Sequence, residues 1–340
     1  MDLNTIWFVL VGILLTGYAV LDGFDLGTGP LLFLVTKEDQ ERRIFLNAIG
    51  PVWNGNEVWL VTGGGALFAA FPEVYATVFS GFYDAFMLLL FALIFRAVGI
   101  EFRHQRPEKS WRTIWDTSFA ISSLVSALLI GVAIGNLAWG IPLDANHDFQ
   151  GNFFTLLNPY ALFVGVTTMA LLMMHANLYL ILKTEGVLQE KLKRWTQATV
   201  PVYLVCFLAL NIITVFTCPH LKTVLHQRAL ILGAIGAVSF LITFNILREV
   251  RRKHEGRAFV SSCLSIVTLM GLFAATVYPN LVISRPDLAD SLNIYNGSAT
   301  EKSLNFMFYV ALIGVPVVLT YTVTIYYVFR GKVVLTKESY

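Results

Sequence analysis

Long apolar segments recur along this chain and are separated by short polar stretches. Each is long enough to cross a hydrocarbon core of about 30 Å as an α-helix, which takes roughly 20 residues. The pattern predicts nine transmembrane helices, at about residues 6–35, 52–71, 74–99, 114–139, 158–182, 198–217, 226–247, 258–279 and 304–329. Only a tight turn around Phe71-Pro72-Glu73 joins the second helix to the third.

The Lys and Arg residues divide unequally between the loops that nine helices would create. Only four of the 24 fall on one side, namely Lys222, Arg228, Arg285 and Lys302. Since cytoplasmic loops are enriched in Lys and Arg, we expect the N-terminus outside and the C-terminus in the cytoplasm. One missed helix would invert every later loop, so the division also supports the count of nine.

Composition indicates the same class of protein. The 340 residues are 56% hydrophobic and 14% charged, against roughly 25% charged in soluble domains. Long apolar runs are typical of an all-α polytopic membrane protein and not of a β-barrel, whose strands alternate in short stretches. No linker divides the chain, so residues 1–340 are expected to form a single integral membrane domain. The net charge of +2 gives no reason to expect a nucleic-acid partner.

Two acidic residues, Asp22 and Asp25, lie inside the first apolar segment, which contains no basic residue. Their spacing of three places both on one face of a helix. An ionisable side chain at membrane depth is costly unless it is paired, hydrated or protonated, so it is a functional-site hypothesis. Gly23 and Gly27 suggest close helix packing around Asp22, which favours a structural role for that residue.

Glu57 lies near the start of the second segment, in Trp53-Asn54-Gly55-Asn56-Glu57. With the predicted orientation, Asp25 and Glu57 both fall in the cytoplasmic half of the membrane. One interpretation is a proton path that opens to the cytoplasm, with the Asn side chains holding water. The other is structural, with the acids pairing with helix ends or with a partner subunit. The residues alone leave these two open.

Two further acids favour a structural interpretation. Asp84 lies about ten residues into the third segment, where a hydrogen bond to a neighbouring helix is expected, although a relay role stays open. Asp116 and Arg112 lie one turn apart at the start of the fourth segment, which predicts an ion pair between them.

The positions of the histidines indicate whether this chain could bind a haem. Of six His residues, only His175 is well inside an apolar segment. A low-spin haem needs two axial ligands at comparable depth, so we expect His175 to be a core residue that hydrogen-bonds to an Asn or a carbonyl. The three cysteines are scattered and give no metal-binding motif. The sequence therefore predicts no haem, other cofactor or metal bound directly by this chain.

Several ordered motifs resemble one membrane protein family, subunit II of the cytochrome bd quinol oxidases, including the cyanide-insensitive quinol oxidases. The resemblance covers nearly the whole chain and is densest over the first 160 residues. It is carried by Gly23-Phe24-Asp25-Leu26-Gly27, Glu41-Arg42-Arg43, Trp53-Asn54-Gly55-Asn56-Glu57-Val58-Trp59-Leu60, Ala66-Leu67-Phe68-Ala69-Ala70-Phe71-Pro72, Phe95-Arg96, Glu101-Phe102-Arg103, Trp111-Arg112, Trp115-Asp116, Gly131-Val132-Ala133-Ile134-Gly135-Asn136, Gly151-Asn152-Phe153-Phe154, Leu157-Asn158-Pro159 and Tyr278-Pro279.

The resemblance implies a heterodimer in the bacterial cytoplasmic (inner) membrane. The partner, subunit I, would carry two b-type haems, haem d and the quinol site. The complex would oxidise quinol, reduce oxygen to water and take protons from the cytoplasm. This chain would support haem insertion, with nine helices in two four-helix bundles plus one peripheral helix. Left open are the quinol type, a structural quinone or lipid on this chain, and a small third subunit.

The resemblance also ranks the candidate residues. Asp25 matches the family's acidic position for proton delivery, and the expected proton-path candidates are Asp25, Glu57, Asn54, Asp22 and Asp84. Some members have Asp where this chain has Asn54, which cannot supply a proton, and Glu57 is placed to compensate. An aromatic-lined gap for oxygen is the second expectation, with ordinary lipid-facing packing as its alternative, and its candidates are Trp53, Trp59 and Phe68.

Two other functions compete with an oxidase subunit. A proton- or ion-coupled transporter would also place acids in its helices, but the sequence shows no inverted repeat of the kind many transporters carry. A pure assembly scaffold differs from the main interpretation only in whether variants keep haem and yet lose turnover.

Overall fold

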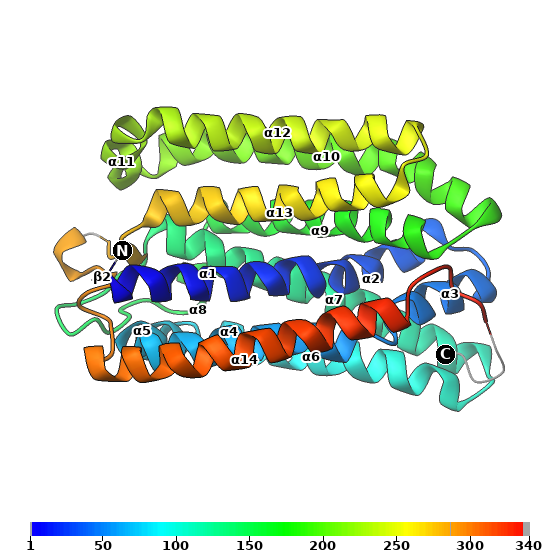
Figure 1. Ribbon diagram of the computed structural model, residues 1–340, viewed down its shortest axis with the longest axis horizontal. Coiled ribbons are helices and arrows are strands. Elements are labelled where there is room, and N and C mark those ends of the chain that lie inside the picture. Colours follow the sequence, from blue (N-terminus) through cyan, green and yellow to red (C-terminus); the bar gives the residue numbers. More distant parts are fainter. Residues whose placement is uncertain (1, 286, 336–340) are drawn as a thin grey trace.

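The computed structural model describes residues 2–285 and 287–335, and most of them are helical. The long helices run along one axis, and the two ends of the chain lie at opposite ends of it (Figure 1). The long helices are α1 (Leu3–Leu21), α2 (Gly23–Val35), α4 (Trp53–Ala70), α6 (Tyr83–Phe102), α7 (Lys109–Trp139), α9 (Pro159–Lys183), α10 (Gly186–Thr217), α12 (Ala229–Arg251), α13 (Glu255–Val277) and α14 (Glu301–Val328). The short elements are α3 (Asp39–Ile49), α5 (Pro72–Gly81), α8 (Phe153–Leu156), α11 (Lys222–Gln227), three 3-10 turns at Arg103–Gln105, Pro219–Leu221 and Leu288–Asp290, and strands β1 (Asn280–Val282) and β2 (Leu292–Asn293).

Eight stretches of the described chain are long and apolar enough to cross a membrane, with α1 and α2 together forming the first. These eight correspond to every predicted segment except 52–71, which forms α4. At 18 residues α4 is roughly 27 Å long, but Asn54, Asn56 and Glu57 lower its hydropathy. The described chain is thus an all-α membrane protein, and the count of nine crossings stays a prediction.

Two predicted segments are interrupted. The first divides at Asp22 into α1 and α2, although bonds from Asp22 N to Tyr18 O (2.8 Å) and from Leu26 N to Asp22 O (3.0 Å) continue the helical pattern. The third divides at Phe82 into α5 and α6. A further helix, α3, lies in the first polar loop, and the apolar pattern gave no sign of it because its buried face is only Phe45, Leu46, Ala48 and Ile49.

The long helices pack side by side around α9. Helix α9 packs against α2, α7, α10 and α13, and α12 packs against α10 and α13. Helix α6 packs against α7, and α4 packs against α1. Helix α14 lies along α1 and α4 at the edge (Figure 1). Its single buried residue is Leu304, so most of its surface faces outward.

The approach of α2 to α9 depends on a glycine. A Cβ atom at Gly27 would lie 2.0 Å from the backbone oxygen of Leu172, which no side chain can tolerate. Beside this contact, the rings of Phe24 and Tyr179 stack with centroids 3.8 Å apart. The glycine therefore allows α2 to lie directly against α9, and its acidic residue, Asp25, is buried within the chain.

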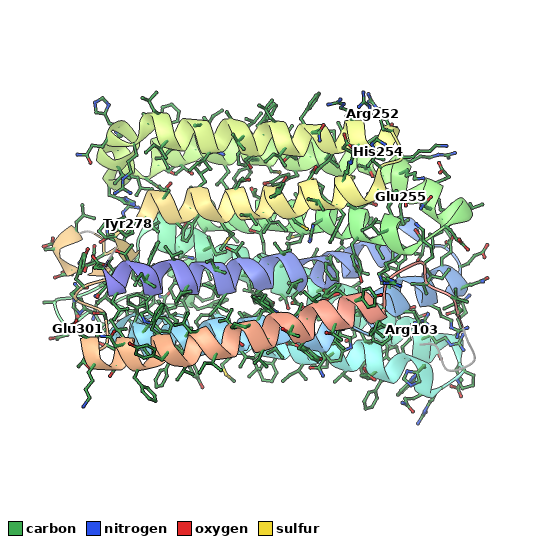
Figure 2. The ribbon with its side chains drawn as sticks, in the orientation of Figure 1. Arg103, Arg252, His254, Glu255, Tyr278 and Glu301 are labelled. Carbon is green, nitrogen blue, oxygen red and sulfur yellow. The ribbon has the colours of Figure 1, made fainter. Side chains whose placement is uncertain are left out.

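One end of the bundle, which we call the α3 end, gathers the loops predicted to share a membrane side. Asp39 of α3 pairs with Arg103 (2.7 Å) and Arg112 (2.8 Å), and Glu41 pairs with Lys191. Glu255 pairs with Lys193 (3.3 Å) and with Lys332 (3.0 Å) from the C-terminal segment. Figure 2 shows Arg103, Arg252, His254 and Glu255 at this end and Tyr278 and Glu301 at the other. These contacts place all five basic loops together, and the side they face stays a prediction.

The opposite end, the sheet end, is closed by backbone pairing. Strands β1 and β2 pair antiparallel, and Ile141 forms a bridge with Ser284. A pocket of about 530 Å³ lies here, lined by Trp139, His220 and Arg285 among others. Because the pocket lies at the sheet end of α7, it is separate from Asp25 of α2.

Candidate functional site

A buried arginine binds two of the predicted acids. Arg96 of α6 is fully buried, and its Nη1 donates to Asp22 Oδ1 at 2.7 Å. Its Nη2 lies 3.5 Å from Glu57 Oε2 of α4. The Asp22 side chain is also fully buried, whereas that of Glu57 is 25% exposed. Side chains from three parts of the chain thus meet at one guanidinium group, and of the two acids that bind it, Glu57 is the partly exposed one.

Asp25 is held differently. It is buried, and its Oδ2 accepts a hydrogen bond from Asn56 Nδ2 at 2.8 Å. The same Nδ2 donates to the Leu21 carbonyl (3.0 Å), while Asn56 Oδ1 accepts from the Tyr326 hydroxyl (2.8 Å). Two acceptors on one side and a hydroxyl on the other fix the orientation of the amide. Asp25 therefore has a neutral hydrogen-bond donor where Asp22 has a cation.

Several polar atoms at this site have no hydrogen-bond partner among the described residues. They are Asp22 Oδ2, Asp25 Oδ1, Tyr18 Oη, and Nε and Nη2 of Arg96. Native proteins leave few such atoms unsatisfied, and an uncompensated buried charge costs several kcal/mol. We call the group formed by Tyr18, Asp22, Asp25, Glu57 and Arg96, with Asn56 and Tyr326, the α2 cluster.

Two of the predicted proton-path residues lie outside the α2 cluster. Asn54 is exposed, and its neighbour Asn56 takes the buried position. Asp84 is exposed in the first turn of α6, twelve residues and roughly 18 Å from Arg96 along that helix. The expected hydrogen bond from Asp84 to a neighbouring helix is not among the contacts of the described residues, and a carboxylate there instead complements the helix N-terminus.

Sequence reasoning missed Arg96 and Tyr326. Arg96 was counted among the loop residues, although it lies three residues inside the end of the predicted segment 74–99. A basic residue within an apolar segment was the available signal. Tyr326 gave no such signal, because it comes from α14 and lies 270 residues from Asn56, its partner, in the chain.

The three candidate residues for an oxygen path are spread along α4. Trp59 is buried and its ring lies against Gly17 of α1, whereas Phe68 is 59% exposed. Trp53 is half-buried at the start of the helix, roughly 22 Å from Phe68 along the axis. The structure does not bring these side chains together, and their role stays a prediction.

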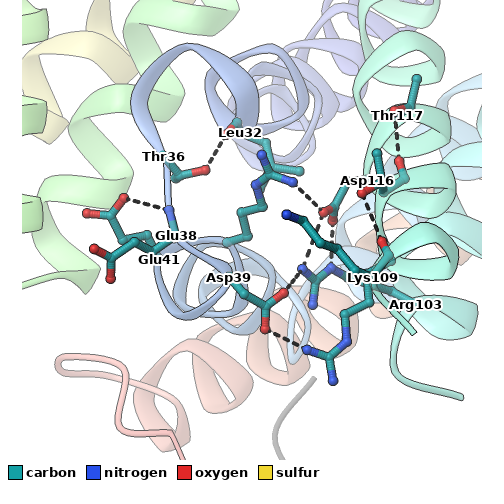
Figure 3. Close-up of polar contacts among 12 residues, drawn as sticks. Leu32, Thr36, Glu38, Asp39, Glu41, Arg103, Lys109, Asp116 and Thr117 are labelled. Carbon is teal, nitrogen blue, oxygen red and sulfur yellow. Dashed lines mark hydrogen bonds and ion pairs between the residues drawn. The ribbon is translucent and has the colours of Figure 1, made fainter. Parts of the chain in front are cut away.

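A second charged group lies at the α3 end (Figure 3). Asp116 Oδ1 accepts from Arg103 Nε at 2.6 Å, and Asp116 Oδ2 accepts from Arg42 at 3.0 Å. Asp39 completes it by binding Arg103 and Arg112. We call these five residues the α3 cluster. The predicted pair between Arg112 and Asp116 is wrong, because α3 brings Asp39 to Arg112 and leaves Asp116 to the other two arginines.

The arginines of the α3 cluster lower the pKa of Asp39. Partial burial raises the pKa of this carboxyl group, but the hydrogen bond and charge of Arg103, with the charge of Arg112, outweigh burial. The pKa of Asp39 therefore lies below its usual value of 3.8. Both carboxylates of this group are thus matched by arginines.

His175 is engaged by protein atoms on both ring nitrogens. Nε2 lies 2.8 Å from the Val20 carbonyl, which confirms the predicted carbonyl partner, and Nδ1 lies 2.7 Å from Ser262 Oγ. A haem iron would need one of these nitrogens, so His175 does not fit as an axial ligand in this arrangement. Within residues 2–285 and 287–335, no cluster of His, Cys, Asp or Glu side chains suits a metal ion.

Comparisons with known proteins agree over nearly the whole chain. The family model described as cytochrome bd terminal oxidase subunit II matches residues 3–329. Cytochrome bd-I ubiquinol oxidase subunit 2 of Escherichia coli K12 is 36% identical, over 99% of this chain and 96% of that protein. Cytochrome bd ubiquinol oxidase subunit 2 of Bacillus subtilis 168 is 33% identical, over 98% of this chain and 97% of that protein.

A solved structure supports the fold. In the bd oxidase of Geobacillus thermodenitrificans, one chain superposes with a TM-score of 0.79 over 97% of this chain and 99% of its own, at 16% identity. That identity supports the architecture alone. The family model and the two relatives carry the assignment, and this chain belongs to the cytochrome bd terminal oxidase subunit II family.

Proposed function

We propose that this chain is the subunit of a quinol:oxygen oxidoreductase that delivers protons from the cytoplasm, with Asp25 as the central proton-accepting group. The redox centres, two b-type haems and haem d, belong to subunit I in this proposal, and the quinol site lies there too. Reduction of oxygen to water consumes protons, and a membrane-embedded oxidase needs a polar route to supply them. This chain's contribution is to hold carboxyl groups at membrane depth in fixed positions.

The observation that carries the proposal is that the three acids have different partners. Arg96 binds Asp22 and Glu57, while Asp25 has Asn56 and Tyr326 as its polar support. An adjacent cation favours the ionised form of a carboxyl group, and the hydrogen-bond donor to Asp25 is a neutral amide. A buried carboxyl group without a cation can change its protonation state, which a proton path requires.

The connection to the cytoplasm follows from the same elements. Asp25 lies ten residues from the end of α2, roughly 15 Å from the α3 end. Glu57 and Tyr326 are partly exposed members of the α2 cluster, and Tyr326 lies two residues from the end of α14 at the α3 end. We infer that the α3 end faces the cytoplasm, in accord with its basic loops. Nine crossings, with the N-terminus outside, complete this orientation.

The test measures quinol oxidase turnover per haem in the purified complex. Replacing Asp25 with Asn keeps the hydrogen bond from Asn56 possible but removes the titrating group, and we expect a loss of about tenfold or more, since a positioned proton-transfer group typically supplies about 10²–10⁴-fold. Glu57→Gln should give a smaller loss, because water at its exposed edge can substitute for it.

The matched control is Asp84→Asn, which removes an exposed carboxylate from α6 and should leave turnover unchanged. Haem content is measured in every variant. Normal turnover in both Asp25→Asn and Glu57→Gln, with full haem, would reject the proton role. Lost haem with normal turnover per haem would show a role in assembly instead.

Other expectations belong to the same proposal. The family assignment favours an oxidase subunit over an ion-coupled transporter, and the relatives' names point to ubiquinol as substrate of the complex. A heterodimer with subunit I in the bacterial cytoplasmic membrane follows from that assignment. A small third subunit, a structural quinone on this chain and an oxygen path along α4 stay predictions.

A further inference from the structure

The α2 cluster contains more negative than positive groups. Asp22, Asp25 and Glu57 face the single cation Arg96. Glu57 is partly exposed, so water can stabilise its charge. The fully buried part then consists of Asp22, Arg96 and Asp25, and it is electrically neutral only if Asp25 or Asp22 carries a proton.

Hydrogen bonds leave one oxygen unused on each aspartate. Asp22 Oδ1 accepts from Arg96 and Asp25 Oδ2 accepts from Asn56, whereas Asp22 Oδ2 and Asp25 Oδ1 have no partner among the described residues. The helical hydrogen-bond pattern continues through Asp22, so Asp22 and Asp25, three residues apart, lie on the same face of one helical turn. A single proton between them would satisfy both unpartnered oxygens and balance the charge.

We propose that Asp22 and Asp25 form one proton-binding site, in which Asp25 holds a proton at Oδ1 and donates it in a hydrogen bond to Oδ2 of ionised Asp22. This inference rests on the proposed function and deepens it, because it gives Asp22 a role in binding the proton. Binding converts the Asp25 carboxylate to a carboxyl group with a proton from the cytoplasmic side, and release reverses the step with no other bond changed.

The roles of the neighbours follow from their contacts. Arg96 Nη1 donates to Asp22 Oδ1, which leaves Asp22 Oδ2 available as an acceptor. Asn56 cannot pass a proton onward, because its Nδ2 only donates and its Oδ1 only accepts in this arrangement. It fixes Asp25 Oδ2 and directs proton binding to Oδ1. A metal cation between the aspartates is disfavoured by the guanidinium group beside them.

The proton affinity of the pair depends on every ionisable group that packs around it. These are Tyr18 of α1, Glu57 of α4, Arg96 of α6, His175 and Tyr179 of α9, and Tyr326 of α14. Of these, only Arg96 and Glu57 carry a full charge in their ordinary states. Changes at Asp22 and Arg96 should therefore dominate the response.

The test is infrared difference spectroscopy of the purified holo-complex as its pH is varied, in the carbonyl-stretch region of protonated carboxylic acids. We expect one band that shifts when the protein is labelled with carboxyl-¹³C aspartate, and that is lost in Asp25→Asn. In Asp22→Asn the band should change frequency, because its acceptor is lost. Its midpoint pH should fall by about 1–3 units, because Arg96 then stabilises ionised Asp25.

Asp84→Asn serves as the matched control and should leave band and midpoint unchanged. The labelling experiment needs no variant, so a missing band overturns the proposal even if Asp22→Asn fails to assemble, and the loss of a band in Asp25→Asn assigns it to this pair. The absence of an aspartate-dependent band in the native complex would overturn the shared proton, and so would a band in Asp22→Asn with native frequency and midpoint.

The two proposals fail separately. Loss of turnover in Asp25→Asn without any aspartate carboxyl band would leave the proton path standing and reject the shared site. A shared carboxyl band with normal turnover in Asp25→Asn would show a proton-binding pair that does not limit the oxidase reaction.

Discussion

The α2 cluster and the α3 cluster use the same residue types to opposite effect. In the α3 cluster, two carboxylates meet three arginines, and Asp116 binds Arg103 and Arg42 with both oxygens. In the α2 cluster, three carboxylates meet one arginine, and several buried polar atoms lack partners. In the proposed function this difference separates the two roles: arginines outnumber carboxylates where charges hold helices together, and carboxylates outnumber the arginine where we propose that a proton binds.

Position explains why each arrangement is tolerated. The α3 cluster lies at the end of the bundle, where the Asp39 side chain is 44% exposed and water moderates its charges. The α2 cluster is enclosed by α2, α4 and α6, where an arginine cannot lose its proton but a carboxylate can gain one. The buried group can therefore relieve its own imbalance by binding a proton.

The largest effect on stability should come from breaking the α3 cluster at its centre. Asp116→Asn leaves Arg103, which is 2% exposed, with a single partly exposed carboxylate partner. Because a buried pair that loses one member costs about 3–5 kcal/mol, the melting temperature of the purified complex should fall clearly. Asp84→Asn is the control, and an equal effect of the two changes would contradict the central role of Asp116.

Arg96→Gln should lower the stability of the complex by less than Asp116→Asn does, and this loss of stability should depend on pH. Without the cation, Asp22 can take up a proton, which for an ordinary aspartate costs at most about 4 kcal/mol at pH 7. That cost falls by about 1.4 kcal/mol per pH unit as the solution becomes more acidic. Thermal unfolding of the variant and of the native complex, compared at several pH values, checks this. A difference that stays constant with pH would show that Asp22 does not protonate.

The smallest effect is expected at Asp39. Its pKa is lowered in the folded state, so its contribution is present above the usual value of 3.8 and is lost as the pH falls through the lowered value. Because the side chain is largely solvated, Asp39→Asn should cost no more than about 1 kcal/mol near neutral pH. The variant and native unfolding curves should converge in acid. A difference that grows below about pH 4 would reverse the assigned direction.

Much of the fold was accessible from hydrophobic pattern alone. Segments of 20 or so apolar residues must form helices in a membrane, since no water is available there for backbone groups. The helix α3 was missed because it is short and polar on most of its surface, and its burial against other helices is a tertiary property. The interruptions at Asp22 and Phe82 escaped prediction because the apolar runs continue through them.

The site was predicted less completely than the fold. Asp22, Asp25 and Glu57 stood out because an acid in an apolar run is conspicuous. Their partners did not, because Arg96 lies near a segment end and Tyr326 lies in a distant helix. The structure buries Asn56 and exposes the predicted candidate Asn54, because nearby positions on a helix point in different directions, and only packing shows which one is inward.

The sequence by itself determined the class of protein, the family and the presence of acids at membrane depth, because each depends on residue type and local spacing. The tertiary structure decided which acid has a cation and which has only an amide. That pairing is set by the approach of α6, α4 and α14 to α2, and by the glycine contact that fixes α2 against α9. Contacts between helices far apart in the chain cannot be read from any one of them.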